Sequence, residues 1–264
     1  ARLYNGQSID TGALRLFADF ADNEFITENS EELLFDESMM EDEAVFSVLA
    51  QCFGPVDESS WNQLAGSSLW SDFLDGARRA MQDAELGVQA APAARARKRC
   101  PLQEFLSSGE VNALFAPPTY DEKQAFAARH FTGGLPESAV PVESLYRTWS
   151  AGAAPAPFSQ QQGLYLGDSA HYLRELVERL GMEVPPAFAA CPDHLALELD
   201  LVAVMLRSGM REEARQFLAE RFAWLTAYRM RLLALEDDAR FYIGLVDVIL
   251  AIRAQQTTAD AVVA

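Results

Sequence analysis

The chain has 264 residues, half of them hydrophobic, and a formal net charge of −18 at pH 7. A chain of this length can bury a substantial core without disulfides or structural metals. The negative charge disfavours binding to nucleic acid and to anionic membrane surfaces, and it favours a cationic partner. Three widely spaced cysteines, and no apolar run near the ~20 residues of a membrane helix, predict a cytoplasmic protein without stable membrane insertion.

The charge is concentrated in an acidic N-terminal extension, residues 1–43, which holds twelve acidic residues against Arg2 and Arg15. Its interleaved aromatic residues favour partial order, either as a short packed helix or as an arm that docks to a basic partner or covers a groove. The basic run at residues 95–99 predicts a solvated loop, with folding back onto the acidic surface, in competition with a cationic ligand, as the alternative.

The first half of the remaining chain predicts helices separated by glycine and proline. Residues 44–53 are an apolar run that ends at Gly54-Pro55, and Asp57 is a capping residue for the helix that follows. Helical spacing continues over residues 71–81, 101–115 and 121–131, with a linker at 86–99 and a loose, proline- and glycine-rich region at 116–165.

The second half is dense in helix. Asp168 or Ser169 is expected to cap a helix that reaches Leu180, and Pro192 to occupy the first position of a central helix that is apolar on nearly every face. Amphipathic helices follow at 211–221, 222–235 and 239–255. With no alternating strand pattern, the sequence predicts an all-α protein, with one bundle-like domain over residues 44–255 and a tail at 256–264.

Catalytic patterns are weak. Ser169 follows Gly167-Asp168 as in some hydrolases, but no strand precedes it. Cys191 lies at a helix start near His194, so a thiol or serine hydrolase that uses Cys191 or Ser169 stays open as an alternative. The histidines lie far apart in sequence, and Cys191-x-x-His194 lacks two further ligands for a metal. We therefore expect no catalytic residue, no metal site and no cofactor.

Three motifs resemble the TorD/DmsD/NarJ family of redox-enzyme maturation chaperones. They are Val111-Asn112-Ala113-Leu114-Phe115-Ala116-Pro117, Pro141-Val142-Glu143-Ser144-Leu145-Tyr146, and Cys191-Pro192-Asp193-His194-Leu195 with Glu198-Leu199. Their order and approximate spacing match the family over about residues 44–255. Val111 stands where the family usually has an aromatic residue, and residues 1–43 lie outside its pattern.

The resemblance implies an all-α chaperone that binds the twin-arginine signal peptide and the apo-form of a molybdopterin oxidoreductase catalytic subunit until its cofactor is inserted. It also implies a monomer or a domain-swapped dimer. An alternative is an assembly factor for a non-exported, nitrate-reductase-like enzyme. Some relatives are linked to guanine nucleotides, but the sequence has no phosphate loop.

The motif residues indicate how such a peptide is recognised. Carboxylates such as Glu143 and Asp193 can accept hydrogen bonds from two guanidinium groups. Pro192 and His194 would form a wall of the same site. The apolar part of the peptide needs an apolar groove, which Leu114, Phe115 and Tyr146 are expected to line. Each of these residues also has a purely structural interpretation, as core or as a helix start.

Overall fold

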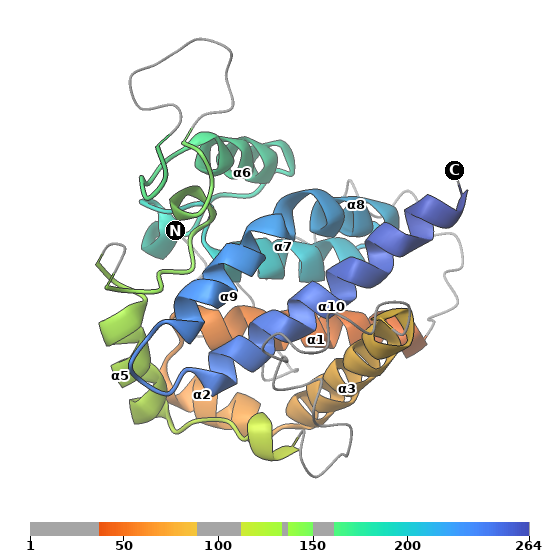
Figure 1. The fold of residues 1–264 in the computed structure, drawn as a ribbon, viewed down its shortest axis with the longest axis horizontal. Coiled ribbons are helices and arrows are strands. Elements are labelled where there is room, and N and C mark those ends of the chain that lie inside the picture. The colour runs from red at the N-terminus through yellow and green to blue at the C-terminus, as the bar shows by residue number, and fades with distance from the viewer. Residues whose placement is uncertain (1–36, 89–111, 134–136, 150–160, 264) are drawn as a thin grey trace.

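The computed structural model describes residues 37–88, 112–133, 137–149 and 161–263, and most of this part is helical (Figure 1). The helices are α1 (Glu37–Phe53), α2 (Glu58–Ala65), α3 (Ser68–Val88), α5 (Tyr120–His130), α6 (Asp168–Arg179), α7 (Leu195–Arg207), α8 (Arg211–Arg221), α9 (Leu225–Leu233) and α10 (Arg240–Val263), with short 3-10 helices η5 (Glu143–Leu145), η6 (Pro186–Phe188) and η7 (Phe222–Trp224). Within these ranges no strand forms, and an isolated antiparallel bridge joins Val142 to His194. The predicted all-α class is confirmed.

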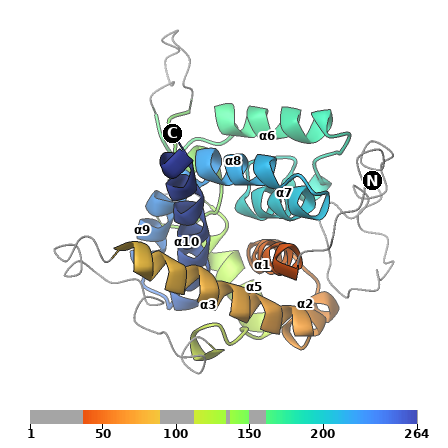
Figure 2. The same cartoon turned by 90° about the vertical axis from the view of Figure 1, so that its right-hand side faces the viewer.

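Helix α7 is the centre of the fold. Every residue from Leu195 to Leu206 is buried, as the apolar character on all its faces predicts. Helix α1 packs along α7 and also contacts α3, while α8 lies beside α7, and α10 packs against α3, α8 and α9. In Figure 2, α6 lies on one side of α7 and α8, and α1 and α3 lie on the other. The core is therefore built around α7, whose N-terminus becomes part of the site described below.

Several helix ends follow the local chemistry of the sequence. Helix α1 ends at Phe53, immediately before Gly54-Pro55. Asp57 caps α2, since its carboxylate accepts hydrogen bonds from the Ser60 amide at 2.9 Å and from the Ser60 hydroxyl at 2.8 Å. Helix α7 ends before Gly209, which has a positive φ of 75°. These ends agree with the predictions from capping and helix-breaking residues.

Two predicted helix starts are wrong. Helix α7 begins at Leu195 and not at Pro192, because His194 is the N-cap and its Nδ1 accepts a hydrogen bond from the Ala196 amide at 3.1 Å. Helix α6 has Gly167 at its N-cap without a side-chain hydrogen bond, and Asp168 is already the first helical residue. Neither Asp168 nor Ser169 therefore caps this helix.

The domain boundaries predicted at residues 43 and 255 stay predictions. Helix α1 begins at Glu37, inside the acidic extension, and α10 runs on to Val263. The rest of the extension, residues 1–36, and the basic run at 95–99 lie outside the described residues. None of the helices in the described part combines the length and the hydropathy that a bilayer crossing requires.

Candidate functional site

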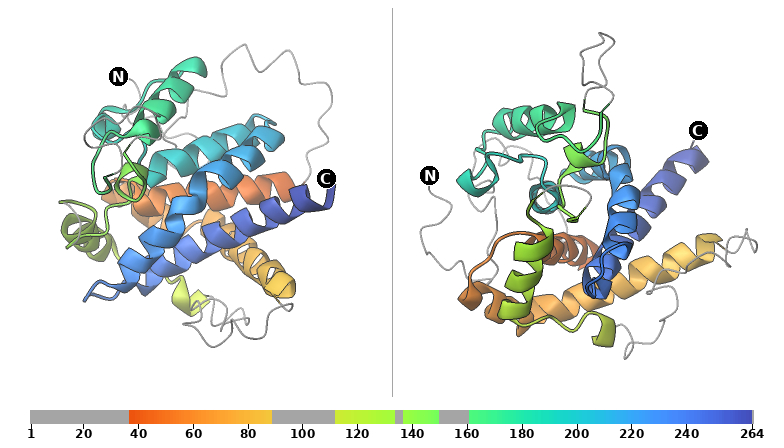
Figure 3. Two further views of the ribbon diagram at one scale, coloured as in Figure 1. Left: turned by 45° about the horizontal axis from the view of Figure 1, so that its top comes forward. Right: turned by 60° about the vertical axis from the view of Figure 1, so that its left-hand side comes forward.

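Two motif segments that are about fifty residues apart in sequence lie side by side. The Glu143 amide donates to the Asp193 carbonyl at 3.0 Å, and the Leu195 amide donates to the Pro141 carbonyl at 2.9 Å. The bridge between Val142 and His194 lies between these two hydrogen bonds. The Pro-x-Glu-Ser-x-Tyr segment is thereby fixed to the residues that start α7. Figure 3 places this segment beside α6, toward the same side of the molecule as α5.

Asp193 ties three parts of the chain together. Its side chain is fully buried, and one carboxylate oxygen accepts hydrogen bonds from the Ser144 amide at 2.7 Å and from the Ser144 hydroxyl. The Ser144 hydroxyl in turn accepts from the Gly167 amide at 3.1 Å, at the start of α6. Burial raises the pKa of Asp193, and the hydrogen bonds from Ser144 oppose this effect. Asp193 therefore holds η5 and the start of α6 against the start of α7.

Glu143 is fully buried and pairs with two arginines, one on each carboxylate oxygen. Arg147 donates from Nη1 to Oε1 at 2.7 Å, and Arg221, at the end of α8, donates from Nη2 to Oε2. The Arg147 side chain is 37% exposed and that of Arg221 is 14% exposed. The guanidinium of Arg221 also lies 4.7 Å from the ring centre of Tyr172 on α6, a residue that is 43% exposed. Glu143 therefore joins η5 to α8, below an exposed aromatic ring.

A third buried acid, Glu198 on α7, completes the cluster. Burial and the neighbouring Glu143 carboxylate raise its pKa well above the ordinary value, which favours the neutral form of Glu198. Among the described residues neither of its oxygens has a donor, whereas a protonated Glu198 can itself donate to Glu143 within hydrogen-bond reach. Arg147 and Arg221 both donate to the Glu143 carboxylate, so two guanidinium groups lie beside this cluster of buried acids.

Pro192, His194 and Tyr146 also lie in this region. Pro192 and His194 are buried, and the His194 ring packs against Phe188 with a centroid distance of 5.0 Å. Burial, reinforced by the positive charge of Lys123, lowers the pKa of His194 to about 3. Tyr146 stacks on Trp224 at 5.4 Å and meets the edge of Tyr228 at 5.5 Å. The structure thus brings Glu143, Tyr146, Pro192, Asp193 and His194 together at one site.

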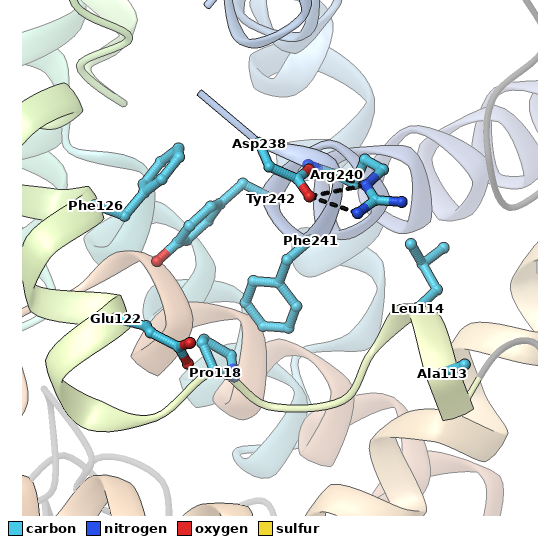
Figure 4. Close-up of a pocket in the computed structure, with 9 residues that line it drawn as sticks. All are labelled: Ala113, Leu114, Pro118, Glu122, Phe126, Asp238, Arg240, Phe241 and Tyr242. Atoms are coloured by element: carbon cyan, nitrogen blue, oxygen red, sulfur yellow. Dashed lines mark hydrogen bonds and ion pairs between the residues drawn. The ribbon is translucent and has the colours of Figure 1, made fainter. Parts of the chain in front are cut away.

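Leu114 and Phe115 lie in a different part of the molecule. Phe115 is fully buried against Phe73, and its carbonyl accepts a hydrogen bond from the Trp70 indole at 3.2 Å. Leu114 lines a pocket of about 560 Å³ between residues 113–118, α5 and the start of α10 (Figure 4). Its walls are mainly apolar, and its residues are Ala113, Leu114, Pro118, Glu122, Phe126, Asp238, Arg240, Phe241 and Tyr242.

The charged residues of this pocket are engaged with neighbours inside the chain. Asp238 pairs with Arg240 at 2.5 Å, and Glu122 accepts hydrogen bonds from the amide and hydroxyl of Thr119 at 2.8 Å. The pocket therefore offers mainly its apolar wall to a ligand. Tyr228 packs against Tyr146 at 5.5 Å, and Phe53 packs against Tyr228 at 6.3 Å and against Tyr242 at 5.8 Å, so buried rings lie between the pocket and the Glu143 site.

Sequence reasoning missed two members of the buried charge cluster, Arg147 and Arg221, and it named Glu198 in the third motif without assigning it to the site. Arg147 follows Glu143 by four residues, so the local pair had a signal in the sequence. Arg221 is 78 residues from Glu143, and no sequence pattern joins the two. Glu198 lies in a mainly apolar buried helix, where a buried acid is itself unusual.

Cys191 does not have the environment of a reactive thiol. Burial and the charge of Asp193 raise its pKa to about 11, and α7 begins four residues later at Leu195. At pH 8 we expect iodoacetamide to alkylate Cys191 at least about 100-fold more slowly than an ordinary cysteine, because its thiolate fraction is lower by that factor. Mass spectrometry of the Cys191 peptide measures the rate, with the urea-unfolded chain as control. Equal rates in the folded and unfolded chain would contradict this assignment.

The described residues contain no group of three or more His, Cys, Asp and Glu side chains that could hold a metal ion. Ser169 is buried in the first turn of α6.

In the part of the chain that the structure describes, the fold is all-helical, and the Pro192-Asp193-His194 turn is fixed to the Glu143 segment. The model of the nitrate reductase delta subunit family matches residues 91–234, which is more than half of the chain, and the chain belongs to this family. The family comprises chaperones that assemble molybdoenzymes, so this protein has a molybdoenzyme maturation role and is not an enzyme. Among curated proteins, none matches this chain significantly.

Proposed function

We propose that this protein binds the twin-arginine signal peptide, or the N-terminal segment, of the apo-form catalytic subunit of a molybdopterin oxidoreductase. It holds this subunit in the cytoplasm until the cofactor has been inserted, before export. The observation that carries the proposal is the carboxylate of Glu143, which is built to accept guanidinium groups and already holds two of them. The net charge of −18 attracts a cationic peptide to this site.

The apolar stretch of the peptide then has a separate place to bind. The pocket beside Leu114, Phe126 and Phe241 has the volume and the apolar wall of a typical ligand pocket. Buried rings lie between the two regions, because Phe53 packs against both Tyr228 and Tyr242, and Tyr228 packs against Tyr146 at the Glu143 site. One extended peptide that binds both regions has to span these rings. Phe115 is fully buried against Phe73, so it belongs to the core next to Leu114 in the chain.

Titration calorimetry with a peptide that carries Arg-Arg and then an apolar stretch tests this function. We expect a dissociation constant on the order of micromolar, which corresponds to about −8 kcal/mol. Binding should weaken as salt is added, because part of the attraction is electrostatic. A peptide with Gln-Gln in place of Arg-Arg should bind at least about tenfold more weakly. Equal affinity of the two peptides, or no binding of either, would refute the proposed function.

The family match favours a second candidate, an assembly factor for a non-exported nitrate-reductase-like enzyme. Such a protein would bind the N-terminus of its client without an export signal. Affinity purification from the native lysate, followed by mass spectrometry, separates the two candidates. A molybdoenzyme subunit with an N-terminal Arg-Arg signal supports the first candidate, and one without such a signal supports the second.

A further inference from the structure

The Glu143 site is occupied from within the chain. Each oxygen of the buried carboxylate accepts a hydrogen bond from a different arginine, Arg147 on one side and Arg221 on the other. Two guanidinium groups on one carboxylate is the arrangement that a ligand with two adjacent arginines would otherwise make. A client arginine can therefore reach this carboxylate only where an internal arginine has moved away.

The two internal arginines are held differently. Arg221 is 14% exposed, lies against the ring of Tyr172, and comes from the end of α8. Arg147 is 37% exposed, and its pairing with Glu143 is local, four residues along the chain. Because Arg147 is already partly exposed, hydration offsets part of the attraction that its side chain loses when it leaves Glu143. Its return needs only side-chain rotation. Arg147 is therefore the exchangeable partner, and Arg221 is the permanent one.

We propose that Arg147 is a resident occupant of a guanidinium-binding site at Glu143, and that an arginine of the client peptide replaces it. This inference rests on the proposed function, because it concerns how the same site is regulated. When Arg147 is away, the buried Glu143 carboxylate keeps Arg221 but lacks its second charged partner, which disfavours the vacated state. The vacated position therefore selects another guanidinium, whose planar fork fits a carboxylate better than the ammonium of lysine does.

The exchange makes the site selective among peptides, because each peptide has to displace Arg147 before it can bind Glu143. A peptide must compete with Arg147, so its apparent affinity is lower than its intrinsic affinity by the fraction of time for which Arg147 is away. Peptides with isolated or weak cationic residues do not displace the resident arginine. A peptide that also places an apolar stretch in the pocket beside Leu114 gains the additional binding energy for the exchange.

Calorimetry of the full chain with the Arg-Arg peptide tests the exchange in the Arg147→Gln variant. We expect this variant to bind about tenfold more tightly than the original chain, as for a resident arginine that covers the site about 90% of the time. Arg179→Gln is the matched control. Arg179 also pairs with a glutamate four residues before it, Glu175 at 3.3 Å, but this pair is exposed and lies on the outside of α6. Both variants remove one positive charge, so a general charge effect would appear equally in both.

The outcomes separate the two levels of the proposal. If the Arg-Arg peptide binds the original chain and Arg147→Gln tightens binding no more than Arg179→Gln does, the exchange is refuted and the proposed function stands. If the peptide binds none of the three proteins, both fail. Arg147→Lys decides the question if Arg147→Gln does not fold. The lysine keeps the charge beside Glu143 with a poorer fit, so binding should tighten by about threefold, and unchanged affinity would overturn the exchange.

Discussion

Replacing Asp193 with alanine is expected to lower the free energy of unfolding by about 3 kcal/mol. The substitution leaves the Ser144 amide and hydroxyl without their buried acceptor, and it releases the link to Gly167 at the start of α6. Urea denaturation followed by circular dichroism measures the loss. Asp193→Asn keeps the shape of the side chain and one acceptor oxygen, so it should lower the free energy of unfolding by less than Asp193→Ala does.

The chain contains a matched control for this substitution. Asp57 accepts the same pair of hydrogen bonds, from the amide and the hydroxyl of Ser60, but it does so at the exposed start of α2. Asp57→Ala should cost about 1 kcal/mol, the usual cost of losing an N-cap. Equal losses of unfolding free energy for Asp57→Ala and Asp193→Ala would show that burial adds nothing to the stability that the Asp193 hydrogen bonds provide.

The second large effect is a dependence of stability on pH that arises from Glu198. Below about pH 4.5 its carboxyl is protonated in both the folded and the unfolded chain. Above this pH the unfolded chain releases the proton and the folded chain keeps it, because the pKa is raised by burial and by Glu143. The free energy of unfolding of the original chain, relative to that of Glu198→Gln, should therefore fall by about 1.4 kcal/mol per pH unit above pH 4.5. A pH-independent difference would contradict a neutral Glu198.

His194 produces the opposite trend over a neighbouring range of pH. Its pKa is lowered from 6.5 to about 3, so between these values the unfolded chain binds a proton that the folded chain does not. Its contribution to stability is complete above pH 6.5 and is lost as the pH falls toward 3. Between pH 4.5 and 6.5 the contributions of His194 and Glu198 oppose each other. Denaturation of Glu198→Gln across this range should therefore reveal a stability that rises with pH.

Local rules predicted much of the fold. The apolar spacing and the breaks at Gly54-Pro55 and Ser208-Gly209 placed α1 and α7, and the predicted range 211–221 coincides with α8. The start of α7 was predicted three residues too early, because Pro192 and Asp193 have the residue types of a first helical turn. In the structure the Asp193 carboxylate accepts a hydrogen bond from the Ser144 amide, 49 residues away in sequence. The spacing of apolar residues cannot predict such a tertiary contact.

The candidate site was predictable only in part. Family motifs led to Glu143, Tyr146, Pro192, Asp193 and His194, and these residues do lie together. The partners that set their charge state come from α7 and α8, which meet η5 only after the chain has folded. Leu114 was expected in the same groove and instead lines the pocket beside Phe126 and Phe241. The proposed peptide site therefore has two separate parts.

The central claim is that a client peptide places an arginine at Glu143 and its apolar stretch in the pocket beside Leu114. Photo-crosslinking with two versions of the Arg-Arg peptide tests it most directly, with a photoreactive residue either next to the arginines or within the apolar stretch. The account predicts that the first version crosslinks to residues 143–149 and 218–224, and that the second crosslinks to residues 113–126 and 238–242. Crosslinks from the arginine end that avoid residues 143–149 and 218–224 would contradict it.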